Sequence, residues 1–175
     1  MKLTLVKPTQ EYAEQVMNYK EEMLANKDRF SGCAGLEDVN SFAEWVDFEH
    51  RLKRKYGEGY APSVVFLAVR VEDGKVVGIL EYRHPLSPFL LEYGGNIGYS
   101  VLPSERRKGY AEKMLGLALE VCRECGEEKV LLTCDKDNEA SRRTIIKNGG
   151  VLENEITDDV GIGESGIIQR YWIML

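Results

Sequence analysis

The chain is poor in the residues from which many metal and redox sites are built. Its 175 residues include only two histidines and four cysteines. Cys122 and Cys125 form a CxxC pair, but no second such pair and no histidine pair accompanies them, so the ligand set of a structural zinc site is incomplete. We therefore expect reduced, structural thiols and no metal.

Long apolar runs and an excess of positive charge are also missing. No run is long enough to span a bilayer, and no basic-then-apolar segment typical of a signal peptide opens the sequence. The formal charge of -6 should repel nucleic acid and anionic lipid surfaces. We expect a cytoplasmic protein with neither nucleic acid nor membrane as a partner. The length suits one domain over residues 1–175, without internal repeats.

The periodicity of the apolar residues changes several times along the chain, between the two-residue period of a strand and the spacing of a helix. It predicts strands over residues 2–6, 64–71, 76–83, 97–101, 130–134, 151–156 and 167–175. It predicts helices over residues 11–25, 39–56, 110–125 and 138–147.

A basic turn separates the strand at 97–101 from the helix that follows it. Three consecutive cations, Arg106, Arg107 and Lys108, stand just before the helix, and Gly109 has no Cβ to obstruct a ligand. Free N–H groups at a helix start carry partial positive charge and attract anions, most naturally a phosphate. A solvated basic turn would have the same composition. A dinucleotide fingerprint and a Gly-Lys-Ser/Thr phosphate loop are both missing.

The spacing of this turn, Arg106-x-x-Gly109-x-Ala111, resembles the pyrophosphate motif of the GNAT superfamily of acyl-CoA-dependent N-acetyltransferases, Gln/Arg-x-x-Gly-x-Gly/Ala. The segment with Asn138, Ser141 and Lys147 is similar to the family's second block. The order β-α-α-β-β-β-α-β-α-β-β extends the resemblance over the chain. It implies a single α/β (α+β) GNAT-fold domain. Its mixed central sheet would have about seven strands and about four flanking helices, with a splayed strand pair holding acetyl-CoA.

The resemblance also implies a cofactor site. Backbone groups of Tyr99 and Val101 would bond the pantetheine arm of acetyl-CoA. The amides of Arg107, Lys108, Gly109, Tyr110 and Ala111 would cradle the pyrophosphate, with Arg106 and Lys108 as cationic supplements. Asn138 and Ser141 would lie near the thioester or the pantetheine. Asn138 could instead be only a helix cap, and Lys147 only a partner of the helix dipole.

The sequence departs from many relatives at the catalytic positions. Ile145 stands where a tyrosine often protonates the thiolate, and Gly95 or Asn96 stands where a glutamate often acts as base. The remaining candidates for acid–base catalysis are Glu81, Tyr82, Glu92 and His84. Proton transfer through ordered water would also suffice.

The implied reaction is direct transfer of an acetyl group to a primary amine, on a small molecule, a peptide or a protein. The acidic residues around the expected acceptor cleft suit a cationic amine such as a polyamine, an aminoglycoside or a lysine side chain, although acidic loops are often only solvated. These residues are Glu92, Glu153, Glu155, Asp158 and Asp159. One alternative is a non-catalytic acetyl-CoA sensor of the same fold. Another, an RNA-directed acetyltransferase, is disfavoured by the net charge. Some relatives pair through their closing strands, so a homodimer is compatible with the resemblance.

Overall fold

The computed structural model describes residues 2–52 and 60–175, and its elements follow the predicted order. The strands are β1 (Leu3–Val6), β2 (Ser63–Arg70), β3 (Val76–Arg83), β4 (Ile97–Val101), β5 (Lys129–Asp135), β6 (Val151–Thr157) and β7 (Ile167–Met174). The α-helices are α1 (Ala13–Ala25), α2 (Phe42–Leu52), α3 (Tyr110–Glu124) and α4 (Glu139–Lys147). Short helical turns are η1 (Gln10–Tyr12), η2 (Leu36–Asp38), η3 (Leu90–Gly94, a π-helix) and η4 (Pro103–Glu105).

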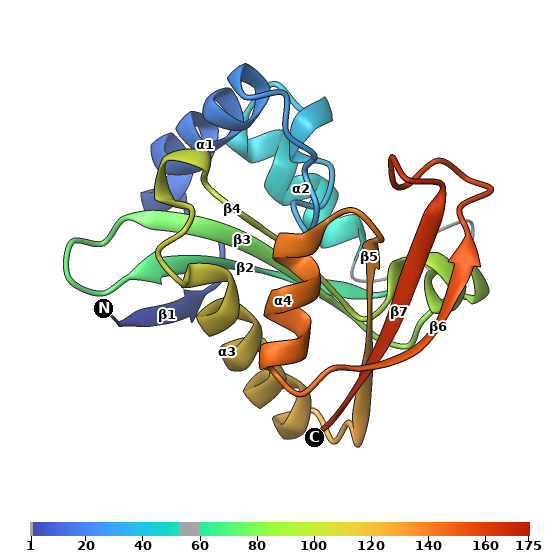
Figure 1. Ribbon diagram of the computed structural model, residues 1–175. Coiled ribbons are helices and arrows are strands. Elements are labelled where there is room, and N and C mark those ends of the chain that lie inside the picture. The colour runs from blue at the N-terminus through green and yellow to red at the C-terminus, as the bar shows by residue number, and fades with distance from the viewer. Residues whose placement is uncertain (1, 53–59) are drawn as a thin grey trace.

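Two antiparallel sheets, ordered β1-β2-β3-β4 and β5-β7-β6, make up the centre of the fold (Figure 1). They meet at the start of β4. The Asn96 N–H donates to the carbonyl of Leu131 at 2.7 Å, and the Leu131 N–H donates to Asn96 Oδ1 at 2.8 Å. Asn96 Nδ2 also donates to the carbonyl of Arg83 at 3.0 Å. Beyond this point no ladder joins β4 to β5 in the described chain, so the two strands part as expected.

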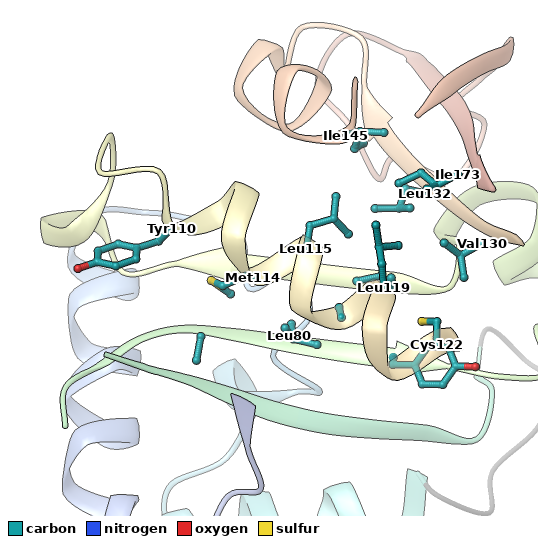
Figure 2. Packing of buried hydrophobic residues seen from close by; sticks show 14 of the residues in the cluster. Leu80, Tyr110, Met114, Leu115, Leu119, Cys122, Val130, Leu132, Ile145 and Ile173 are labelled. Carbon is teal, nitrogen blue, oxygen red and sulfur yellow. The ribbon is translucent and has the colours of Figure 1, made fainter. Parts of the chain in front are cut away.

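Helices cover both faces of the first sheet. In Figure 1, α1 and α2 lie on one face, and α3 lies on the other with α4 beside it. The apolar stripe of α3 builds one core. Figure 2 shows Leu115 and Leu119 pointing toward Leu132 and Ile145, while Leu80 of β3 lies on the opposite side of the helix. The other core lies beneath α1 and α2, where Trp45 is fully buried and donates its indole N–H to the Cys33 carbonyl at 2.8 Å.

Three details differ from the sequence predictions. Every ladder among the described residues is antiparallel, and two sheets stand where one mixed sheet was expected, since the splayed strands 97–101 and 130–134 form no parallel ladder. The first helix begins with the 3-10 turn η1, and α2 begins at Phe42 rather than at residue 39. The predicted end of the second helix, residues 53–56, lies outside the described residues. No described helix has the length and hydropathy of a membrane span.

Candidate functional site

The turn between β4 and α3 leaves a row of backbone amides free. Arg107 and Gly109 both adopt positive φ, at 61° and 78°, and Gly109 caps α3 without a side-chain hydrogen bond. Over residues 2–52 and 60–175, the structure gives no protein acceptor for the N–H groups of residues 107–112. A helix start with free amides carries the partial positive charge that binds anions. The predicted anion-binding turn therefore has the required geometry.

A cleft of about 770 Å³ opens beside this turn, and we call it the turn cleft. Its walls come from residues 27–31, the end of β4, the turn itself, and α4 with the residue before it. Ten of the eleven predicted cofactor residues line it: Tyr99, Val101, Arg106, Arg107, Gly109, Tyr110, Ala111, Asn138, Ser141 and Lys147. The eleventh, Lys108, does not.

The three cations of the turn differ in their ion-pair and hydrogen-bond partners. Arg106 pairs with Asp28 at 2.8 Å and donates from Nε to the Val101 carbonyl at 3.1 Å. Lys108 pairs with the buried Glu105 at 2.9 Å. In the described part of the chain Arg107 has no ion pair, and it lines the turn cleft. Arg107, rather than Lys108, is therefore the cation of this turn available to an incoming anion.

The exposed edge of β4 faces the gap between the sheets. The Leu102 N–H donates to the Val77 carbonyl, and the Asn96 carbonyl accepts from the Arg83 N–H. In an antiparallel pair the bonded residues alternate, so the even-numbered positions of β4 bond to β3. The backbone groups of Tyr99 and Val101 therefore point toward β5, where a ligand can reach them.

Two hydroxyl groups that line the turn cleft, one from the start of α4 and one from β4, are in contact. Asn138 Oδ1 accepts from the Ser141 N–H at 3.1 Å, so Asn138 does act as a helix cap. Ser141 Oγ lies 3.1 Å from Tyr99 Oη. Burial raises the pKa of Tyr99 to about 12 against the opposing effect of that hydrogen bond, so the phenol keeps its proton at neutral pH.

Lys147, at the C-terminal end of α4, pairs with Glu112 of the first turn of α3 at 2.8 Å. Both residues line the turn cleft. The contact joins the two helices across the cleft floor, and it is compatible with the helix-dipole role considered for Lys147.

Two smaller cavities continue inward from the turn cleft. The junction cavity, of about 260 Å³, lies between the parting strands and shares Tyr99 and Ser141 with the turn cleft. The α2 cavity, of about 340 Å³, lies beneath α2 and shares Gly32, Arg83 and Leu90 with the junction cavity. A row of adjoining cavities therefore runs from the free amides to α2.

The sequence profile of the acetyltransferase (GNAT) family matches residues 19–149. The chain belongs to the GNAT family. This assignment makes it an acyl-CoA-dependent transferase and confirms the resemblance drawn from the turn and the second block. A comparison with curated protein sequences gives no match.

Solved structures of acetyltransferases share the GNAT fold of this chain. The microcin C7 self-immunity acetyltransferase MccE, in complex with acetyl-CoA and AMP, is 18% identical with a TM-score of 0.70, over 99% of this chain and 93% of that chain. The acetyltransferase of Salmonella typhimurium that modifies the N-terminal serine of ribosomal protein L7/L12 is 17% identical with a TM-score of 0.70, over 100% and 96%. The spermidine/spermine N-acetyltransferase SpeG of Vibrio cholerae is 15% identical with a TM-score of 0.66, over 99% and 92%.

Within this GNAT fold, three of the four predicted catalytic residues line none of the three cavities, and two of these three share one partner. Tyr82 Oη donates to Glu127 at 2.7 Å, and His84 Nδ1 lies 2.5 Å from the same carboxylate, with the two rings stacked. Glu127 follows the C-terminal end of α3. Both side chains lie on the α3 side of the sheet, because alternation along β3 turns Tyr82 to the α3 face and His84 follows it; their acid–base roles stay predictions.

The other two candidates have different positions. Glu81 points to the opposite face of β3 from Tyr82 and lines the α2 cavity, where Arg83 pairs with it at 2.7 Å. Glu92 belongs to η3 and lines none of the three cavities; its carbonyl accepts from Arg170 Nη1 at 2.6 Å. Of the four, Glu81 alone faces the row of cavities.

The acidic residues expected around the acceptor are engaged elsewhere in the structure. Glu153 pairs with Arg170 and Glu155 with Lys136, each at 2.9 Å, and Asp158 accepts from backbone amides of its own loop. None of the five expected carboxylates lines the three cavities.

Sequence reasoning missed two acidic residues that line the α2 cavity, Glu37 and Asp38 of η2. Burial, with the charges of Asp38 and Glu81, raises the pKa of Glu37. The only signal was the run Gly35-Leu36-Glu37-Asp38, which resembles an ordinary loop, and no periodicity relates it to β3.

The four cysteines differ in their burial. Cys122 of α3 lies in the buried core, Cys33 and Cys134 are also buried, and Cys125 is exposed; all four thiols are free. Within the described chain no three metal-ligating side chains gather in one place.

Proposed function

We propose that this GNAT protein transfers an acetyl group from acetyl-CoA to a primary amine, by direct attack of the amine in a ternary complex. The observation that carries the proposal is the continuous row of cavities. It has free amides and Arg107 at one end, parted strands in the middle and carboxylates at the other. An anionic cofactor with a long arm suits the first two parts, and a cationic acceptor suits the third.

In this proposal the pyrophosphate of acetyl-CoA binds the amides of residues 107–111, with Arg107 alongside. The arm lies between β4 and β5, where the backbone groups of Tyr99 and the N–H of Val101 face the gap; the Val101 carbonyl already accepts from Arg106 Nε. The thioester then reaches Ser141 at the junction cavity. That MccE is described in complex with acetyl-CoA supports the choice of cofactor.

The Tyr99–Ser141 pair suits the second half of the reaction. The amine nitrogen attacks the thioester carbonyl, the C–S bond breaks, and the sulfur needs a proton to leave as a thiol. We assign that proton to the Ser141 hydroxyl, which recovers it from Tyr99, and Tyr99 recovers it from solvent. Ser141→Ala and Tyr99→Phe should lower kcat by about 10²-fold while leaving the Kd for acetyl-CoA within a few-fold. Unchanged kcat in both variants would refute the assignment of Ser141 and Tyr99 as the proton donors.

The acceptor in this proposal is a cationic amine. Two of the similar structures are described as acting on amines of different size, a ribosomal protein N-terminus and spermidine. The α2 cavity holds three carboxylates against one guanidinium, Arg83, which favours a positively charged ligand. A cavity of this charge next to the thioester end also favours turnover over a sensor that only binds acetyl-CoA.

Calorimetric titration with acetyl-CoA tests the first half of the proposal, and release of CoA thiol across a panel of amines tests the second. The panel should include polyamines, aminoglycosides, and peptides with a free N-terminus or a lysine. We expect micromolar binding and CoA release that depends on one class of amine. Failure to bind acetyl-CoA would refute the cofactor site, and binding without release on any amine would favour the sensor.

A further inference from the structure

The α2 cavity presents carboxylates from two opposite walls. Glu37 and Asp38 come from η2, in the loop between α1 and α2, and Glu81 comes from β3. These residues are far apart in the sequence, and only the packing of the loop against the sheet brings them to one cavity.

Glu81 is fixed in place yet keeps one oxygen open. Its side chain is buried, and Oε2 accepts from Arg83 Nε at 3.0 Å and from Arg83 Nη2 at 2.7 Å. Oε1 has no hydrogen-bond partner among residues 2–52 and 60–175, and the residue lines the cavity. This open oxygen can therefore accept a hydrogen bond from a ligand or from water in the cavity.

Glu37 lies in a different electrostatic setting. The charged and titratable groups around it are Asp38 of η2, Lys20 of α1, and Glu81 with its partner Arg83 on β3; Tyr60 also lines the cavity. Glu37 is exposed at its outer side, but partial desolvation and the charges of Asp38 and Glu81 raise its pKa, against a backbone hydrogen bond and Lys20, which lower it. Lys20 is itself engaged with the Val39 carbonyl. A carboxylate whose charge is disfavoured is a better proton acceptor than an ordinary surface glutamate.

The α2 cavity adjoins the junction cavity where two glycines meet. A Cβ on Gly32 would lie 2.2 Å from the Gly98 carbonyl oxygen, so the loop backbone rests directly on β4. Gly32 lines both the α2 cavity and the junction cavity, and Gly98 lines the junction cavity. The α2 cavity is therefore the neighbour of the cavity that Tyr99 lines, where we place the thioester.

We infer that this pair of carboxylates binds and deprotonates the acceptor: Glu81, held by Arg83, orients the ammonium group, and Glu37 takes its proton. The inference rests on the proposed function. The R–NH₃⁺ group gives one proton to the Glu37 carboxylate and becomes R–NH₂, whose lone pair attacks the thioester carbonyl. The amide formed loses its second proton to solvent, Glu37 returns its own proton to solvent, and CoA leaves as the thiol.

The test uses the full chain and the amine that releases CoA fastest in the panel. Glu37→Gln should lower kcat/KM by about 10²-fold, and Glu37→Asp should recover part of that loss. Glu120→Gln, at an exposed glutamate of α3 outside the three cavities, is the matched control and should keep wild-type rates. Acetyl-CoA affinity should be the same in all four proteins.

The pH profile separates a proton acceptor from a merely attractive charge. In the wild type, kcat/KM should rise with pH through the pKa of Glu37 and then level off, because the ionised carboxylate is the active form. In Glu37→Gln only amine that is already neutral can react, so kcat/KM should keep rising about tenfold per pH unit up to the pKa of the amine. A raised KM with the wild-type profile would overturn Glu37 as the proton acceptor. Turnover equal to that of the control would overturn the inference alone, whereas absence of acetyl-CoA binding or of CoA release in the wild type would overturn the proposed function with it.

Discussion

Gly109→Ala is the substitution that most directly examines the anion-binding turn. Gly109 has φ +78°, and a Cβ built there meets no protein atom within 4 Å. The cost to folding is therefore backbone strain alone, about 1–2 kcal/mol for a non-glycine residue in the left-handed region. Part of it is offset because alanine restricts the unfolded chain. The net loss should be about 1 kcal/mol, which lowers Tm by about 2–4 °C in a protein of this size.

The effect on acetyl-CoA should be much larger than that on stability. The added methyl group would stand in the turn cleft beside the free amides of residues 107–111, where we place the pyrophosphate. We expect the Kd measured by calorimetry to rise at least tenfold, which corresponds to about 1.4 kcal/mol.

Gly126→Ala supplies the control within the same helix. Gly126 follows the C-terminal end of α3, has φ +85°, and also leaves an added Cβ without a protein neighbour within 4 Å. Both variants should therefore lose similar stability by thermal denaturation, but only Gly109→Ala should lose affinity. Equal acetyl-CoA affinity in the two variants would show that the turn does not contact the cofactor.

Two further substitutions examine the supports of the cleft. The pKa of Glu105 is lowered to about 2, because hydrogen bonds from Lys75 and Lys108 outweigh the opposing effect of burial. The ionised carboxylate therefore stabilises the fold fully above the unfolded pKa, and this contribution is lost as pH falls from about 4.5 to 2. Glu105→Gln should cost about 3 kcal/mol at pH 7 and should flatten the urea-measured stability curve across that acid range; an unchanged curve would contradict the assignment. Asn138→Ala removes the cap on the Ser141 N–H and should cost about 1 kcal/mol, with Asn138→Ser recovering most of it; a loss of acetyl-CoA binding without a loss of stability would instead indicate direct contact.

The sequence predicted the architecture and the cofactor side of the site because both depend on local signals. The β4–turn–α3 segment combines a two-residue period, a cluster of cations and a helical period within fifteen residues, so its geometry is nearly determined by neighbours in the chain. The engagement of those cations was not predictable. Arg106 forms an ion pair with Asp28, and Lys108 forms one with Glu105. Only the folded structure shows that Arg107 is the cation of the turn available to a ligand.

The proposed acceptor side depends on contacts between distant segments, which no periodicity in the sequence reveals. Glu37 faces Glu81 across a cavity that forms only when the α1–α2 loop rests on β4. The sequence did include Glu81 among its candidates but gave equal standing to Tyr82 and His84, whose side chains alternation along β3 sends to the opposite face. The register of a strand decides which face of the sheet each side chain points to, and a one-residue shift in register exchanges the two faces.

Asn96, at the vertex where the two sheets meet, has a mechanical consequence. One buried side chain and its own backbone bind both Arg83 of the first sheet and Leu131 of the second. The two sheets are therefore joined at Asn96 and lie apart beyond it. From Asn96 to the end of β4 is about 16 Å at the usual rise per residue. At that distance, a rotation of β4 by about 5° about Asn96 would move the turn after β4 by about 1.4 Å. Such a rotation would widen or narrow the turn cleft, where we propose that acetyl-CoA binds.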